Sequence, residues 1–182
     1  AWLGPVGKAL AAAVNVREAA ALAARYIELL VHGQRLTVEL SGPTCTLRLG
    51  MIAGHDPLGV SVVQQSSVLV IANVLEELIG RPDFPRRLRF ACPAPRAHGH
   101  RARIERAGRR LDFDAQLWSV ELPSACLRLP LRATGSPTPP DVLVELAGER
   151  ARLDAQRGLR GRLALALLHH LADAPPLSDV AR

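Results

Sequence analysis

A long apolar stretch, from Gly59 to Gly80, constrains this chain more than any other feature of its sequence. Its β-branched residues would suit a strand, but about twenty residues without a turn are typical of a helix. Gly80, followed by Pro82, predicts where that helix ends. Because the apolar arc spans roughly half of the helix circumference, we expect the helix to lie against a sheet or between layers. The face predicted to be apolar comprises Val60, Val63, Ser67, Val70, Ile71, Val74, Leu75 and Leu78.

Two polar residues, Gln64 and Ser67, lie within the apolar arc of this predicted helix. At about 100° per residue they are about 60° apart, and both point where a sheet should be. A buried amide or hydroxyl is costly unless it finds a hydrogen-bond partner. Two interpretations stay open: the pair is satisfied inside the core, or it faces a ligand pocket.

Composition indicates one domain with an aliphatic core, since the 182 residues are 48% hydrophobic but only 3% aromatic. The net charge of +6 rests on arginine, because Lys8 is the single lysine, and this bias is typical of a GC-rich bacterial gene. Neither a secretory leader nor an uninterrupted apolar run of membrane-spanning length is visible, so we expect a cytoplasmic protein. The chain does not begin with methionine, and we expect it to be truncated at its N-terminus.

The cysteines and histidines indicate neither a disulfide framework nor a metal or catalytic site. Cys45, Cys92 and Cys126 are far apart, and their odd number favours reduced thiols. Cys92 precedes His98 and His100, but a fourth metal ligand is not evident, so a solvated loop is favoured over a metal site. Neither a phosphate-binding loop nor a set of nucleophile, base and orienting group is visible. We therefore expect no metal, no cofactor and no catalytic residue.

The segment from Arg96 to Arg110 is strongly basic, with arginine at Arg96, Arg101, Arg103, Arg106, Arg109 and Arg110. The arginine bias of the whole chain favours a solvated face. An anion site, or a surface close to DNA in a longer protein, is the open alternative. Aromatic residues that could stack on single-stranded bases are missing from the segment.

Alternating patterns predict a small sheet. A β-hairpin is expected over Arg35–Ser41 and Thr44–Leu49, further strands over Arg86–Cys92 and Leu111–Asp114, and an extended start that turns helical near Pro123 over Trp118–Leu131. Helices are expected over Leu3–Val14, from a capping box at Asn15 and Glu18 to about His32, over Asp141–Gln156 and over Arg162–Leu171. The predicted fold class is α+β: a small, mainly antiparallel sheet of about four strands covered by helices, one of them long and central. A cupin-like barrel would need about eight strands.

Candidate ligand-binding residues follow from the same periodicity. A pocket needs mostly apolar walls with a few well-placed polar groups. The candidates are Gln64 and Ser67 on the long helix, Tyr26 on the second helix, Arg87 and Arg89 on the third strand, and Trp118 as a wall of the cavity.

The order of elements resembles the N-terminal regulatory domain of AraC-type bacterial transcription regulators, in the branch named for an arabinose-binding-like domain. The matching pieces are LGPVGKALAAAVNVREAAALAARYIELL, the hairpin, the apolar helix, RRLRFACPAPR, and RRLDFDAQLWSVELPSACLRLPLR ahead of the proline-rich break at Ala133–Pro140. The final PPLSDVAR resembles the start of a helix-turn-helix domain. By this resemblance, residues 1–173 form a sensing and dimerisation domain, and residues 174–182 lead into a DNA-binding domain that is absent here.

The resemblance implies a sensor that binds a small effector, forms a homodimer and contacts DNA only through the attached domain, without a membrane. Leu163, Leu167 and Leu171 are expected to join a two-fold interface. Two other classes stay open. A structural dimerisation module would lack a cavity of about 300 Å³ or more. A small hydrolase would place a nucleophile beside a base in a cleft.

Overall fold

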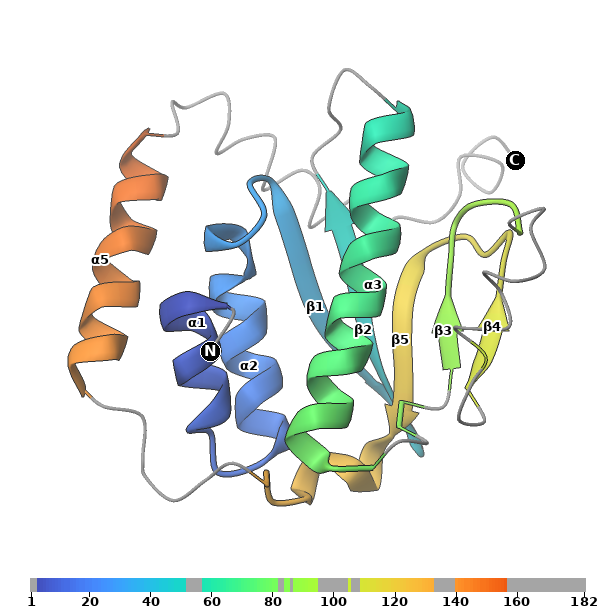
Figure 1. Ribbon diagram of the computed structural model, residues 1–182, viewed down its shortest axis with the longest axis horizontal. Helices are drawn as coiled ribbons and strands as arrows, with labels where there is room; N and C mark the ends of the chain where they lie inside the picture. The colour runs from blue at the N-terminus through green and yellow to red at the C-terminus, as the bar shows by residue number, and fades with distance from the viewer. Residues whose placement is uncertain are drawn as a thin grey trace, which may run out of the picture.

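The computed structural model describes residues 3–51, 57–81, 84–85, 87–94, 105, 109–132 and 140–156. Its helices are α1 (Gly4–Ala11), α2 (Val16–Tyr26), α3 (Pro57–Ile79) and α5 (Pro140–Gln156), with short 3-10 helices η1 (Ile27–Leu29) and η2 (Ser124–Arg128). Its strands are β1 (Gln34–Ser41), β2 (Thr44–Met51), β3 (Arg87–Arg89), β4 (Arg110–Asp112) and β5 (Trp118–Pro123). They form one sheet in the order β1-β2-β5-β3-β4, with α2 and α3 lying side by side against it (Figure 1).

The predicted α+β class is confirmed, with five strands instead of about four. The additional strand is β5, which we expected to begin extended but did not count as a strand. It occupies the centre of the sheet, between β2 and β3, and pairs antiparallel with both. The β3–β4 pair is parallel, so the sheet is mostly but not wholly antiparallel. β3 is shorter than the predicted strand, ending at Arg89 ahead of the prolines.

One face of the sheet is apolar because the hairpin and β5 are in a register that aligns their aliphatic residues. Leu36 of β1 lies opposite Leu49 of β2, and Leu47 of β2 lies opposite Val120 of β5. Val120 in turn lies opposite Leu88 of β3. All five side chains are buried beneath the helices. This is the face that the alternating pattern predicted to be the inner one.

The other face of the sheet carries charged cross-strand pairs. Arg48 on β2 lies 2.8 Å from Glu39 on β1, and Arg89 on β3 lies 2.9 Å from Glu121 on β5. Arg87 bonds to both Asp112 of β4 and Glu121. Opposite charges on neighbouring strands stabilise a sheet whose described covering helices pack on its other, apolar face.

The Arg87–Asp112 pair gives a stability test. Burial alone would raise the pKa of Asp112, but its hydrogen bonds to Arg87 and Arg110 outweigh burial and lower that pKa. Asp112 therefore contributes stability above the unfolded pKa of a carboxylate, near 4, and loses it as the pH falls through the lower folded value. Asp112→Asn should lower the free energy of unfolding by about 1 kcal/mol at pH 7.

Denaturant melts of Asp112→Asn and the wild type across the acidic range check this prediction. The difference in unfolding free energy between Asp112→Asn and the wild type should decrease as the pH falls below about 4. Glu145→Gln, at an exposed position of α5, is the control. A difference that does not depend on pH would contradict the assignment.

The N-terminal helices follow the predicted capping. The side chain of Asn15 accepts a hydrogen bond of 3.0 Å from the backbone N–H of Glu18, and the Glu18 carboxylate accepts one of 2.7 Å from the backbone N–H of Val14. In a standard capping box the Glu18 carboxylate would bond to the backbone N–H of the N-cap residue, Asn15. Here it bonds to the residue before it. We expected α2 to continue to His32, but it tightens into η1 after Tyr26, and Gly33 with φ 78° then turns the chain into β1.

The long helix α3 confirms the central prediction, and it begins at Pro57, two residues before the predicted start. It ends at Gly80, whose φ of 71° suits glycine and where a side chain would collide with Arg132. Within the described part of the chain, α3 is also long and apolar enough to span a bilayer, by length and composition alone. Core helices pass the same test, and here α3 packs on β2, β5 and β3.

Several predictions fall outside the described residues. They are the proline-rich break apart from Pro140, the basic segment apart from Glu105, Arg109 and Arg110, and the helix over Arg162–Leu171 with its expected interface leucines.

Candidate functional site

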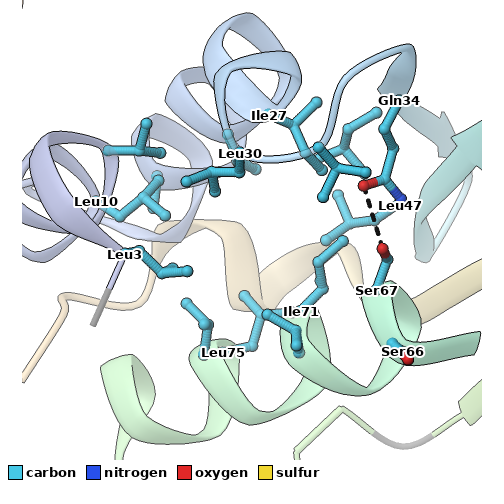
Figure 2. Close-up of a pocket in the computed structure, with 18 of the residues that line it drawn as sticks. Leu3, Leu10, Ile27, Leu30, Gln34, Leu47, Ser66, Ser67, Ile71 and Leu75 are labelled. Carbon is cyan, nitrogen blue, oxygen red and sulfur yellow. Dashed lines mark hydrogen bonds between the residues drawn. The ribbon is translucent and has the colours of Figure 1, made fainter. Parts of the chain in front are cut away.

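A cavity of about 510 Å³ lies between α3 and the α1–α2 pair, with β1 and β2 at one end. Figure 2 shows Leu3 and Leu10 pointing toward Ile71 and Leu75 of α3 across this space. Gln34 and Ser67 meet at the end nearest the sheet. The described residues that line the cavity are Leu3, Val6, Leu10, Ala19, Ala20, Ala23, Ile27, Leu30, Val31, Gln34, Leu36, Leu47, Val62, Val63, Ser66, Ser67, Val70, Ile71, Val74, Leu75 and Leu78.

The cavity exists because the apolar arc of α3 faces both the sheet and the α1–α2 pair. One line of side chains, including the fully buried Val68 and Ala72, is the deepest part of the helix. The adjacent line, with Val70, Ile71 and Val74, is only partly buried and borders the cavity toward α1 and α2. The arc is therefore wide because it faces both the sheet and a cavity that is partly open to solvent, where Val62 and Leu30 are 56% and 41% exposed.

Three polar side chains form a hydrogen-bonded cluster at the sheet end of the cavity. The Ser67 hydroxyl lies 3.1 Å from Gln34 Oε1 and 2.9 Å from the Val63 carbonyl, both of which can accept its proton. Gln34 Nε2 donates to Gln64 Oε1 at a longer distance of 3.4 Å. Gln34, Gln64 and Ser67 are 1%, 2% and 8% exposed, so the cluster is essentially buried. A cluster of this kind is retained only if its members are satisfied.

Two of the predicted site residues belong to this cluster. Ser67 lines the cavity, whereas Gln64 lies behind it and contacts Gln34. Both residues are therefore satisfied by a buried partner, Gln34, and the ligand-pocket interpretation of the pair stays a prediction. Tyr26 is 2% exposed in the core and does not line the cavity, and the guanidinium of Arg25 lies 5.4 Å from its ring centre.

The remaining three predicted residues lie elsewhere. Arg87 and Arg89 are on the charged face of the sheet, paired with Asp112 and Glu121, while the cavity is on the apolar face. Trp118 packs edge-to-face on Phe90, with ring centres 6.1 Å apart, and does not line the cavity. None of these three residues lines the cavity. Their assignment to a ligand site stays a prediction.

The sequence-based site lacked Gln34 and Ser66. Gln34 could have been found, because it precedes Leu36, Val38 and Leu40 at a spacing of two and so occupies the first inward position of the hairpin. Ser66 is not part of the apolar face predicted from the sequence, yet it lies at the rim of the cavity. Its hydroxyl donates to the Val62 carbonyl at 2.9 Å, one turn back along its own helix.

A second, polar cleft of about 480 Å³ lies behind the cavity, between η1, β1 and α5. Ile27, Gln34 and Leu36 border both spaces. In the cleft, Arg150 of α5 donates to the Arg25 carbonyl at 3.1 Å and lies 3.3 Å from the buried carboxylate of Glu28. These contacts fasten α5 to the end of α2.

The charges around the cleft act on Arg35, which projects from β1. Burial, together with the like charge of Arg150, lowers the pKa of Arg35, and Asp154 partly offsets this. Arg35 nevertheless remains protonated at neutral pH, since an arginine guanidinium is effectively always charged in proteins. The cleft is thus a charged seam, whereas the cavity is apolar.

Two of the described thiols, those of Cys45 and Cys92, are poor nucleophiles. Burial raises the pKa of Cys45, which is fully buried on β2. Burial and the nearby charge of Asp114 raise the pKa of Cys92. A raised thiol pKa leaves little thiolate at neutral pH. Among the described residues, no group of three or more His, Cys, Asp or Glu side chains is placed to hold a metal ion.

Comparison with known families assigns most of the chain to one family. Residues 1–131 match the family described as the arabinose-binding domain of AraC transcription regulator, N-terminal. The chain therefore belongs to this family of regulatory domains of transcription regulators, and the predicted resemblance is confirmed. The members are regulatory ligand-binding domains and not enzymes, as we expected for this chain.

A solved structure shares the fold. The chain is similar to the crystal structure of the transcriptional regulator CdpR from Pseudomonas aeruginosa, with a TM-score of 0.64 at 20% sequence identity. The similarity covers 96% of this chain and 56% of that one, so this chain spans little more than half the length of that regulator. No curated protein matches this chain in a sequence search.

Proposed function

We propose that this chain is the effector-sensing domain of a bacterial, cytoplasmic AraC-type regulator, and that the effector binds in the cavity between α3 and the α1–α2 pair. The observation that carries the proposal is the cavity itself. Its volume of about 510 Å³ is in the range of small-molecule sites. A purely structural dimerisation module would have no need for such a space, and family membership argues against a hydrolase.

In this proposal, residues 1–173 sense the effector and form a homodimer, and residues 174–182 lead to a helix-turn-helix domain that contacts DNA. Neither the domain nor its effector requires a membrane. The wall formed by Ile27, Gln34 and Leu36 supports a route for the signal, because it separates the cavity from the cleft that holds α5. A ligand that moves this wall would change how α5 is held.

Native mass spectrometry of the purified chain tests the proposal. We expect a dimer that carries one small molecule per subunit. Equilibrium sedimentation provides the independent measurement of the subunit number. A monomer at high concentration would exclude the dimer, and a chain without retained or added ligand mass would exclude the sensor.

Arg150→Gln tests the route through α5. Arg150 holds Glu28, which is 4% exposed, and the substitution removes the positive charge while keeping a shorter, polar side chain. We expect a loss of about 1–3 kcal/mol in unfolding free energy. Hydrogen exchange should accelerate in α5 more than in β2 and β5.

Arg152→Gln is the matched control. Arg152 pairs only with Glu149 among the described residues, within α5 itself and with both side chains at least half exposed. Equal effects of the two substitutions would show that the contact between α5 and Glu28 has no special role.

A further inference from the structure

The chemistry of the cavity wall restricts what it can bind. Among its described lining residues only Gln34, Ser66 and Ser67 have polar side chains, and none is charged or aromatic. The other lining residues are Ala, Val, Leu and Ile. Their surface offers dispersion contacts and no hydrogen bonds, so it favours a flexible aliphatic ligand.

A sugar does not fit this wall. Each hydroxyl that is buried without a partner loses its hydrogen bonds to water, and a sugar would bury several of them. A carboxylate or an ammonium group does not fit either, because none of the described lining residues carries a charge that would compensate its desolvation. The ligand is therefore neutral and mostly apolar.

The polar cluster can satisfy one head group. Gln34 Nε2 has two N–H groups, of which one makes the long 3.4 Å bond to Gln64. The Ser67 oxygen has lone pairs and already donates its proton, to Gln34 or to the Val63 carbonyl. An incoming hydroxyl could thus donate to Ser67, and it could accept from Gln34 once that side chain, which is 1% exposed, turns toward the cavity. Ser66 donates back to its own helix and sits at the rim.

We propose that this cavity binds a neutral aliphatic molecule with a single hydrogen-bonding head group, such as an alkanol, with the head at Gln34 and Ser67 and the chain directed toward Leu10 and Leu75. Figure 2 shows the path, with the polar pair at one end and the leucines at the other. The assignment rests on the proposed function, since it names the class of effector for the same cavity.

Thermal unfolding and calorimetric titration of the 182-residue chain compare three probes at neutral pH: decanol, decanoate and L-arabinose. Decanol should raise the melting temperature in a concentration-dependent manner, because it binds the folded state. Decanoate, which is ionised, should bind at least about tenfold more weakly, and arabinose should not bind. Tighter binding of arabinose or decanoate than of decanol, or no binding of decanol, would overturn the class.

Two serine variants locate the head group. Ser67→Ala should weaken decanol binding about three- to tenfold, the value of one neutral hydrogen bond. Ser61→Ala, on the same helix but outside the described lining of the cavity, should leave it unchanged. Equal effects of both substitutions would overturn the placement of the head.

The failures of the two proposals are distinguishable. If arabinose binds and a side chain that fills the cavity abolishes its binding, the ligand class is wrong and the sensing role stands. If the purified chain carries no ligand and binds none of the three probes, the sensing role fails as well. Decanol binding that survives filling of the cavity would be non-specific and would overturn this assignment.

Discussion

Ile71→Trp is expected to abolish decanol binding by closing the cavity from α3. Ile71 is partly buried and points into the space that the ligand chain would occupy (Figure 2). The indole would take that volume, and we expect a loss of affinity of about a hundredfold or more. The free energy of unfolding should change by less than about 2 kcal/mol, since filling an internal space offsets the strain of a larger side chain.

Val144→Trp is the matched control for this substitution. Val144 is 72% exposed on α5, so the same indole is added away from the cavity. Titration calorimetry and thermal melts of both variants separate loss of the site from loss of the fold. Wild-type affinity in Ile71→Trp would place the ligand somewhere else in the protein.

Gln34→Leu is expected to cost about 1–3 kcal/mol of stability, because it leaves the buried Gln64 carbonyl without its described donor. The loss of the Gln34 acceptor should cost Ser67 less stability, since its hydroxyl keeps the Val63 carbonyl as an acceptor. The double variant Gln34→Leu/Gln64→Leu replaces both amides with apolar groups of similar size. It should recover most of the loss.

Denaturant unfolding of the two single variants and the double variant completes a thermodynamic cycle. A coupling energy of about 0.5–3 kcal/mol is expected for two residues in contact. Additive losses would mean that the 3.4 Å contact contributes nothing. In the double variant decanol should bind more weakly despite the regained stability, because the head group loses Gln34.

Local patterns predicted the elements well. The hairpin, α3 and the Asn15 cap each depend on residues close in sequence, so alternation, helical spacing and capping chemistry identified them. The change from α2 to the 3-10 helix η1 was not predicted, because no residue in this segment disfavours continuation of the α-helix. β5 was not counted because its extended start is followed at once by η2, and a mixed segment has no single period.

The site was harder to predict because the existence of a cavity depends on how far apart the surrounding helices and strands lie. Periodicity placed Ser67 on the correct side of α3, but it does not tell how far α1 and α2 stand from that helix. Arg87 and Arg89 were included as polar groups of the third strand, although alternation with Leu88 already placed them on the opposite face of the sheet. Gln34 was overlooked at the boundary between a turn and a strand, where patterns are weakest.

The two faces of the sheet have consequences for divergence among related regulators. The ion pairs of Glu39, Arg48, Arg89 and Glu121 lie on one face, and the cavity lies on the other. Substitutions at Val62, Val63 and Val70 would reshape the cavity without touching those pairs or the hairpin. Selection for a new effector can therefore act on a few positions of one helix, while the scaffold that holds them keeps its sequence.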